Sequence, residues 1–266
     1  MPTTIRRAAL LAALATLAVA APATAATLEK TIEGTYSLDH GGSVRVENVN
    51  GTIAVTSWDR DDVRVVAHKK VRAATSERAA GAMEDLKVLV SAEPDELRVR
   101  TRHPRSGDGS FLRWLRDAEV STSVSYELTV PRGVRLDAET VNGRLDLDRV
   151  DGDFSLTTVN GTIRVTGARG RLDADTVNGT IDVELVEVDP DAELDFSTTN
   201  GAVRIALPQD VRTRLDVRTT NGGIDIDFPV EVRGTWGRHR VNADINGGGG
   251  VVSVRTTNGG VRIRRL

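Results

Sequence analysis

The feature that most constrains this chain is an Asn-Gly pair that recurs seven times within one frame of apolar residues. Apolar residues stand six and four positions before each asparagine, and again three and five positions after it. Alternation of this kind indicates two strands that each turn one face inward. The pairs are Asn50-Gly51, Asn142-Gly143, Asn160-Gly161, Asn178-Gly179, Asn200-Gly201, Asn221-Gly222 and Asn258-Gly259.

The spacing of the pairs predicts the fold class. From Asn142 onward the asparagines lie 18, 18, 22, 21 and 37 residues apart, and periods near 20 residues are typical of solenoid rungs. We therefore predict an all-β chain that forms a single-stranded parallel β-helix, or β-solenoid, with a right-handed coil. Asn-Gly between strands is more commonly a hairpin turn, but identical residues at identical offsets favour parallel rungs that stack like upon like.

The Asn-Gly pairs are interpreted as the structural corners of the rungs. The last inward residue of one strand and the first inward residue of the next are an odd number of positions apart, whereas strict alternation requires an even number. The turn must therefore shift the alternation by one residue. A turn with positive φ does this, and Gly accepts positive φ freely while Asn tolerates it. Stacked asparagines should then bond to one another along the axis, as amide ladders do in cross-β assemblies.

A second column supports the stacking. The outward residues four positions after each Asn alternate in sign from unit to unit, which predicts that each carboxylate lies between two guanidinium groups. Exposed pairs of this kind contribute only about 0–1 kcal/mol each, so their expected role is to favour the correct register. The residues are Asp146, Arg164, Asp182, Arg204, Asp225 and Arg262.

The chain divides into three predicted segments. Residues 1–25 have the charged start, apolar stretch and Ala23-Thr24-Ala25 cleavage site of a secretory signal peptide. Residues 26–130 form an N-terminal β region that contains a short helix near 76–86 and a loop insertion at 103–118. Residues 131–266 form the repeat solenoid, continuous with the N-terminal region.

The two irregular parts of the N-terminal region have separate predictions. In the helix, Ser76 is the expected cap and Ala79, Ala80 and Met83 share one side, so the helix should cover an open end of the core. The insertion at 103–118 carries Phe111 and three further large apolar residues among arginines. It either touches a membrane surface or partner, or folds back to plug the solenoid.

Composition excludes several classes of protein. The chain has no cysteine, so it has neither disulfides nor thiolate metal sites. Its formal net charge is −3, which argues against a nucleic-acid partner. No stretch in residues 26–266 reaches the roughly 20 apolar residues of a transmembrane segment. The four histidines are scattered, and we expect no metal and no cofactor.

Several local motifs resemble a known bacterial family. They are the Thr-Val-Asn-Gly and Thr-Thr-Asn-Gly units, the segment from Ser57 to Val65, and the segment from Val130 to Val134. Together they resemble the putative-adhesin family, a domain of unknown function with β-strand repeats, from about Leu28 to Leu266. The resemblance implies an exported, β-helical protein of the cell envelope, in the periplasm or at the surface. It brings no catalytic residues with it.

Two groups of charged residues are candidate binding surfaces. A possible acidic binding face recurs five and three positions before the asparagines, and it could also hold a divalent cation, although a solvated surface is the simpler interpretation. A possible basic tip near the C-terminus could meet an anionic surface or guard an exposed strand edge. The acidic residues are Asp137, Glu139, Asp173, Asp175, Asp195 and Asp216. The basic residues are Arg240, Arg255, Arg262, Arg264 and Arg265.

The sequence favours a non-enzymatic envelope protein whose charged columns bind a macromolecule: an envelope protein, a glycan or an anionic surface. One alternative is a polysaccharide-active enzyme on the same scaffold, because stacked carboxylates could reach the separations that glycosidases use. Another is an envelope-stress sensor that binds cationic peptides on the acidic face. The carboxylates recur with the repeat and are not gathered at one place, so we expect no catalytic site.

Overall fold

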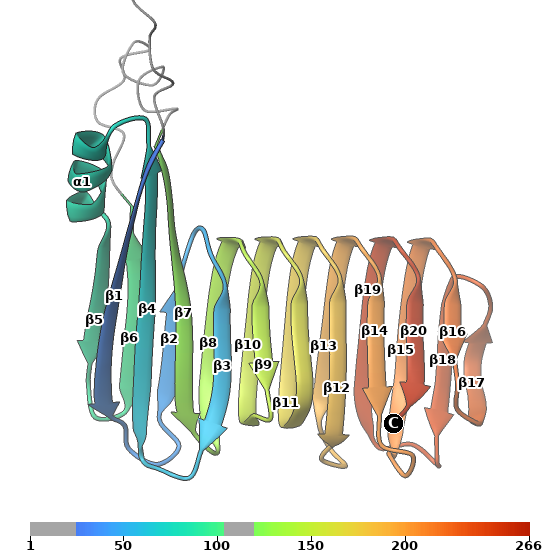
Figure 1. Cartoon of the computed structure of the whole chain (residues 1–266). Coiled ribbons are helices and arrows are strands. Elements are labelled where there is room, and N and C mark those ends of the chain that lie inside the picture. Colours follow the sequence, from blue (N-terminus) through green and yellow to red (C-terminus); the bar gives the residue numbers. More distant parts are fainter. Residues whose placement is uncertain (1–24, 104–119) are drawn as a thin grey trace, which may run out of the picture.

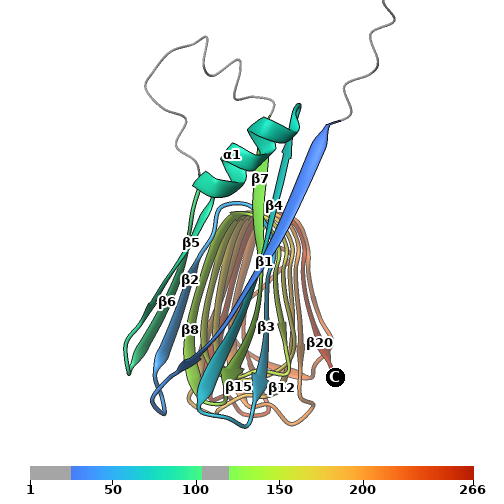
Figure 2. The ribbon, with the colours of Figure 1, turned by 60° about the vertical axis from the view of Figure 1, so that its left-hand side comes forward.

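The computed structural model describes residues 25–103 and 120–266. Over these residues a single sheet joins twenty strands and coils into a solenoid, with one short helix at its N-terminal end (Figure 1). Turned by 60°, the molecule shows two walls of strands with the helix above one end of them (Figure 2). The predicted signal peptide and loop insertion fall almost entirely outside the described residues.

The N-terminal region forms seven strands and the helix, which precede the repeats. They are β1 (Ala26–Ser37), β2 (Ser43–Glu47), β3 (Ile53–Trp58), β4 (Asp62–Ala73), α1 (Ser76–Asp85), β5 (Lys87–Ala92), β6 (Glu96–Arg102) and β7 (Ser121–Pro131).

The repeat region forms the remaining strands. They are β8 (Val134–Asn142), β9 (Leu145–Asp148), β10 (Asp151–Asn160), β11 (Ile163–Asn178), β12 (Ile181–Glu187), β13 (Glu193–Asn200), β14 (Val203–Leu207), β15 (Thr213–Asn221), β16 (Ile224–Ile226), β17 (Val230–Trp236), β18 (Arg240–Ile245), β19 (Gly250–Asn258) and β20 (Val261–Arg265).

Each repeat unit contributes one strand to each wall, and equivalent residues pair. In the first wall β2, β8, β10, the second half of β11, β13, β19 and β15 run parallel in that order. In the second wall β3, β9, the first half of β11, β12, β14, β20 and β16 do the same. Leu136, Phe154 and Leu172 are register partners, for example.

The ends of the solenoid are antiparallel. At the N-terminal end β1 pairs with β4, β4 with β7, and β5 with β6, all antiparallel. At the other end β15 pairs antiparallel with β18, and β18 with β17. The structure therefore confirms an all-β solenoid with one short helix, but its sheet is mixed and not parallel throughout.

The units do not stack in sequence order. The unit of Asn258 inserts between those of Asn200 and Asn221, because β19 pairs with β13 on one side and with β15 on the other. The 37-residue step between the last two pairs makes this possible, since the chain uses it to form β17 and β18 outside β15 before it returns. The prediction of consecutive stacking was wrong at this point.

The apolar frame of the sequence becomes the core between the two walls. The residues six and four positions before each Asn are buried, and so are those three and five positions after it in six of the seven units. In the Asn221 unit, Ile224 and Ile226 are half-buried, because β16 is the last strand of its wall. Alternation with period two thus predicted the inward face of both walls correctly.

The asparagines form the predicted ladder along the corner. Six of the seven amide Nδ2 groups donate to the Oδ1 of a neighbouring rung over 2.7 to 2.9 Å, which gives a ladder without a gap from Asn50 to Asn221. The Nδ2 of Asn50, at the end of the ladder, donates to the carbonyl oxygen of Thr122 over 3.3 Å. Beneath it, five of the six threonines two positions earlier donate from Oγ1 to the glycine carbonyl of the adjacent rung, as Thr176 does to Gly161 over 3.3 Å, and Thr140 does not. The ladder fixes the register of the rungs at this corner.

The reason for glycine at the corners differs from the prediction. Of the seven corner glycines only Gly51 has a positive φ, at 126°. At the others the constraint is close approach: a Cβ atom on Gly179 would lie less than 3.0 Å from the carbonyl oxygen of Gly161 in the next rung. A Cβ atom on Gly143, which follows Asn142, would likewise lie less than 3.0 Å from the carbonyl oxygen of Gly51. Glycine is needed because rung backbones touch.

The helix α1 covers the N-terminal end, as expected. Its N-cap is Thr75 and not Ser76; the Thr75 side chain accepts a hydrogen bond from the backbone N–H of Arg78 over 3.3 Å. Ala79 is buried and Met83 packs against the core, while Ala80 is exposed. The buried Lys69 donates from Nζ to the carbonyl oxygen of Met83 over 2.9 Å. This bond anchors the helix to β4.

Candidate functional site

The outward side of the first wall carries the predicted acidic residues. We call it the charged face and define it by the outward side chains of β2, β8, β10, β11, β13, β19 and β15. Its central column is Arg45, Asp137, Ser155, Asp173, Asp195, Ser253 and Asp216. A second column, two residues nearer the asparagines, is Glu47, Glu139, Thr157, Asp175, Ser197, Arg255 and Arg218. All six predicted acidic residues therefore lie on this surface.

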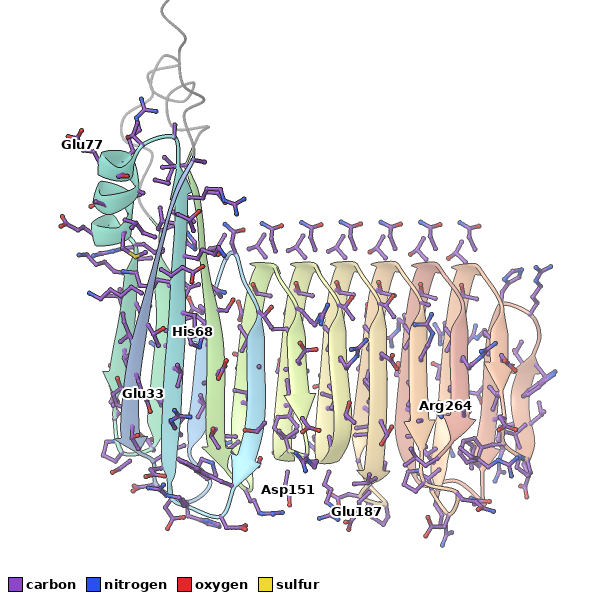
Figure 3. The ribbon with its side chains drawn as sticks, in the orientation of Figure 1. Glu33, His68, Glu77, Asp151, Glu187 and Arg264 are labelled. Atoms are coloured by element: carbon purple, nitrogen blue, oxygen red, sulfur yellow. The ribbon has the colours of Figure 1, made fainter. Side chains whose placement is uncertain are left out.

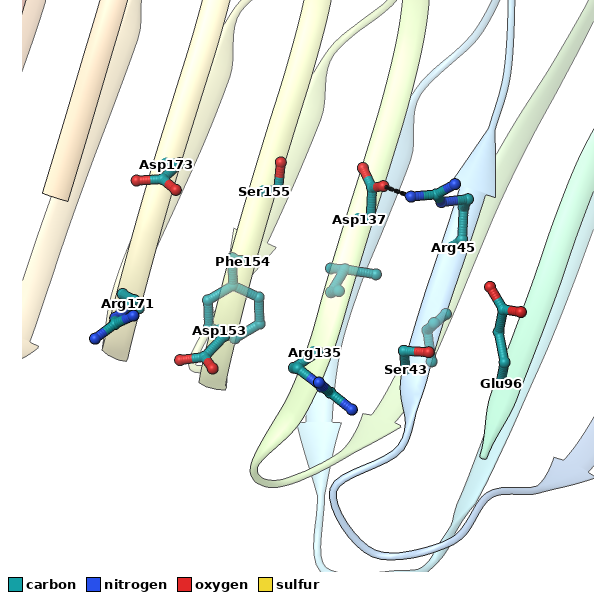
Figure 4. A pocket seen from close by; sticks show the side chains of 12 residues that line it. Ser43, Arg45, Glu96, Arg135, Asp137, Asp153, Phe154, Ser155, Arg171 and Asp173 are labelled. Atoms are coloured by element: carbon teal, nitrogen blue, oxygen red, sulfur yellow. Dashed lines mark ion pairs between the residues drawn. The ribbon is translucent and has the colours of Figure 1, made fainter. Parts of the chain in front are cut away.

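A shallow cavity of about 260 Å³ lies on the charged face over β2, β8, β10 and β11, and Glu96 of β6 also lines it. Figure 4 shows two rows of side chains across it, with Arg45, Asp137, Ser155 and Asp173 in one. The other row is Arg135, Asp153 and Arg171, whose signs alternate from strand to strand. The cavity presents charges of both signs, so it suits a polar ligand that crosses several strands.

Some carboxylates of the charged face are already neutralised by arginines. Asp137 lies 2.6 Å from Arg45, and Asp195 lies 2.8 Å from Arg255. Asp216 lies 2.8 Å from Arg218. These pairs are largely solvent-exposed, so each contributes about 0–1 kcal/mol to stability. They hold the side chains in place more than they stabilise the fold.

Asp173, Asp175 and Asp195 form the acidic cluster of this face. Asp173 and Asp195 are register partners on β11 and β13, and the backbone N–H of Asp195 donates to Asp173 Oδ1 over 3.3 Å. Although Asp173 and Asp175 are exposed, desolvation by the surrounding strands raises the pKa of both, and the charge of Asp195 raises them further. Because Asp195 already pairs with Arg255, Asp173 and Asp175 are the carboxylates that would mainly attract an incoming cation.

The predicted basic tip does not form. Arg262, Arg264 and Arg265 lie on β20 in the second wall, whereas Arg255 lies on β19 in the first and Arg240 on β18. Because β19 and β20 insert inside the stack, the four arginines on these two strands are separated from Arg240, which lies on β18 beside the last strand β17. Arg262 instead pairs with Asp225 over 3.0 Å and Arg265 with Asp227 over 3.2 Å. Figure 3 shows Arg264 well inside the length of the solenoid.

The same insertion interrupts the predicted alternation of charge on the second wall. Asp146, Arg164, Asp182 and Arg204 follow one another as expected. Arg204 then has Arg262 as its register partner, and Asp225 comes after it. The alternation therefore breaks at one step, where two arginines are neighbours. Sequence order alone could not show this, because it depends on which unit stacks on which.

A buried carboxylate near the C-terminal end was missed by the sequence interpretation. The Asp244 side chain is 1% exposed and accepts hydrogen bonds from Arg233 over 2.6 Å and from Arg214 over 3.3 Å. Burial alone would raise the pKa of Asp244, but the two arginine hydrogen bonds and charges outweigh it and lower the pKa. This residue joins β15, β17 and β18. In the sequence it resembles any other strand aspartate.

A buried polar network, also unpredicted, marks the junction of the N-terminal region with the repeats. Thr101 Oγ1 donates to Asn48 Oδ1 over 2.9 Å and lies 2.6 Å from the Tyr126 hydroxyl. Asn48 Nδ2 in turn donates to the carbonyl oxygen of Val124 over 2.8 Å. Burial raises the pKa of Tyr126 to about 12. Asn48 stands where six other units have threonine, which was the only signal in the sequence.

The described residues contain neither a candidate metal site nor a candidate membrane-spanning helix. Within residues 25–103 and 120–266, no three His, Asp or Glu side chains are grouped so that they could hold a metal ion. In the same ranges no helix has the length and apolar character that crossing a membrane requires.

Comparison with known proteins identifies the family. The chain matches the Toastrack DUF4097 family over residues 25–264 and belongs to it. No curated protein matches the chain.

Several solved structures are similar over nearly the whole chain. A putative cell adhesion protein from Clostridium sporogenes ATCC 15579 has 10% identity and a TM-score of 0.44, covering 90% of this chain and 100% of its own. A putative adhesin from Bacteroides fragilis NCTC 9343 has 11% identity and a TM-score of 0.34, with coverage of 89% and 97%. A putative lipid binding protein from Parabacteroides distasonis ATCC 8503 has 8% identity and a TM-score of 0.24, with coverage of 90% and 96%.

Proposed function

We propose that this chain is a non-enzymatic protein of the cell envelope, exported by its N-terminal signal, whose charged face binds an extended macromolecule. The observation that carries the proposal is the acidic cluster of Asp173, Asp175 and Asp195 beside the cavity. Desolvation raises the pKa of Asp173 and Asp175, and repulsion from Asp195 raises it further; a bound cationic group would offset both effects by pairing with the ionised carboxylates.

The shape and charges of the surface favour a protein partner. The cavity is shallow and its lining residues come from five strands, so a ligand must be long enough to contact several of them at once. Arg135 and Arg171 lie in the row beside the acidic cluster, and they can take the anionic groups of the same ligand. A peptide segment with charges of both signs fits this pattern better than an anionic lipid surface, which the carboxylates repel.

The distribution of the carboxylates supports binding over catalysis. They recur on neighbouring strands along an open wall, and three of them are held by arginines. A glycosidase needs one carboxyl with a raised pKa opposite a second that is free to act as base or nucleophile. Affinity here would be spread over the columns, so single substitutions should weaken binding in small steps.

The proposal is tested by capture from defined envelope fractions. Residues 26–266 are immobilised and exposed separately to detergent-solubilised bacterial envelope proteins, peptidoglycan and anionic lipid vesicles, at low and at high salt. The Debye length falls from about 10 Å at 0.1 M salt to about 3 Å at 1 M. We expect retention of envelope protein that is lost at high salt. Retention of nothing, or retention that salt does not reduce, would contradict the proposal.

A further inference from the structure

The C-terminal end of the solenoid presents a free strand edge. Among the described residues β17 pairs only with β18, so its other edge has unpaired backbone N–H and C=O groups. Figure 1 shows β17 as the last strand at that end, opposite the end that carries α1. An edge of this kind is a template for pairing with another strand.

The inward side of β17 is apolar but not covered. Val230, Val232 and Trp236 are the register partners of Ile245, Ala243 and Val241, which are 2% exposed or less. Val232 and Trp236 are nevertheless 52% and 54% exposed, because no further strand follows. At the opposite end α1 packs against β1 and β4. The core of the solenoid therefore reaches solvent at β17, where burial of apolar surface would be favourable.

The charges of β17 are complementary to those of a second copy of the same strand. Glu231 and Arg233 stand on either side of Val232. If two β17 strands pair antiparallel about a two-fold axis at Val232, Glu231 of each copy lies opposite Arg233 of the other, and the two Val232 residues face each other. Arg233 already donates to Asp244, but its side chain remains 54% exposed and can donate to a second carboxylate.

We propose that two copies of this chain associate through β17 in a two-fold dimer, which continues the sheet and covers both open ends of the core. A two-fold arrangement is closed, because it uses the same strand of both copies. A head-to-tail contact between β17 and the free edge of β1 or β5 would instead form open chains. The dimer leaves the charged face of each copy free, so it is independent of the proposed function.

A single engineered cysteine tests the geometry directly, because the chain has no cysteine of its own. Residues directly opposite on antiparallel strands have Cβ atoms about 4.5–5.5 Å apart, near the distances from which a disulfide forms. Val232→Cys should therefore give a covalent dimer on oxidation. Val177→Cys is the matched control, since Val177 is 43% exposed at the Asn corner and far from β17. It should give little covalent dimer under the same conditions.

Sedimentation of the unmodified chain provides the second measurement. We expect a monomer–dimer equilibrium that Val232→Lys weakens about tenfold or more, because it places two like charges at the axis. Val177→Lys should leave the equilibrium unchanged, and circular dichroism checks that both variants fold. A chain that sediments only as a monomer would overturn the proposal. So would open-ended polymers, or a Val177→Cys variant that cross-links as fast as Val232→Cys.

Discussion

Replacement of Gly179 by alanine should destabilise the solenoid strongly, although its φ lies outside the positive region. The added Cβ would come within 3.0 Å of the Gly161 carbonyl oxygen, so the two rungs must move apart. Three hydrogen bonds lie at this contact. Gly161 N donates to Asn178 O over 3.1 Å, Ile163 N to Thr180 O over 3.0 Å, and Thr176 Oγ1 to Gly161 O over 3.3 Å.

The size of the effect follows from these three bonds. An intramolecular hydrogen bond contributes about 1 kcal/mol net, so loss of all three lowers the free energy of unfolding by about 3 kcal/mol. For a domain of about 150–250 residues this corresponds to a fall in Tm of about 6–12 °C. Urea denaturation followed by circular dichroism measures the free energy, and calorimetry measures the Tm.

Two matched variants separate close approach from backbone conformation. Gly223→Ala is the control, since Gly223 has no atom within 4 Å of an added Cβ and no positive φ; it should be neutral or slightly stabilising. Gly179→Asn distinguishes the causes, because Asn tolerates positive φ but carries a Cβ. If Gly179→Ala stays within about 0.5 kcal/mol of wild type, a shift typical of neutral surface changes, close approach of the rungs does not require glycine at this corner. A harmless Gly179→Asn would lead to the same conclusion.

Three further predictions concern particular side chains. Asn178→Ala removes two ladder bonds, to Asn160 and from Asn200, and should lower the free energy of unfolding by about 2 kcal/mol. Val177→Thr beside it should be neutral in the same urea assay. Equal effects of the two substitutions would show that the ladder does not stabilise the fold. Asp244→Asn should lower stability at pH 7, and the difference should close as the pH falls below about 3.9. The reason is that the pKa of the Asp244 carboxylate is lower in the folded protein than in the unfolded chain. Its contribution to stability is therefore present above the unfolded pKa and is lost as the pH falls through the folded pKa. A stability difference between wild type and variant that stays constant with pH would contradict this prediction. Of the two tyrosines, Tyr126 should ionise only near pH 12 in an absorbance titration, and a normal titration of both would show that its hydroxyl is not buried.

The local pattern predicted the parts of the fold that depend on local spacing. Alternating residues such as Leu136 and Ala138 gave the inward faces, and the repeated Asn gave the ladder, because both follow from stacking identical units. The short helix was placed within a residue of its observed bounds. Its cap was shifted by one residue, since Thr75 and Ser76 are both good N-cap residues and only the backbone geometry separates them.

The features of the fold and of the site that the sequence did not predict depend on contacts between distant segments. The order of the last two units is set by the hairpin of β17 and β18, and no feature within Asn221 or Asn258 indicates it. The arginines of the expected basic tip were dispersed for the same reason. The role of the corner glycines depends on the distance between two rungs, which no single unit contains. The position of the acidic residues was predictable, whereas their arginine partners, such as Arg255 for Asp195, were not.

Binding through the charged face can be tested by comparing two charge-matched triple variants for capture of envelope protein at low salt. One variant carries Asp→Asn substitutions in the acidic cluster of the charged face, and the other carries the same three changes on the second wall. Both lose three negative charges, so net charge does not differ between them. The first set is Asp173, Asp175 and Asp195, and the second is Asp146, Asp182 and Asp225.

We expect the charged-face variant to lose most of the captured protein, because it removes the carboxylates that attract the partner. The second-wall variant should capture nearly as much as wild type. Both variants should retain the circular dichroism spectrum of the solenoid. Equal capture by the two variants, or a greater loss from the second wall, would contradict the assignment of binding to the charged face.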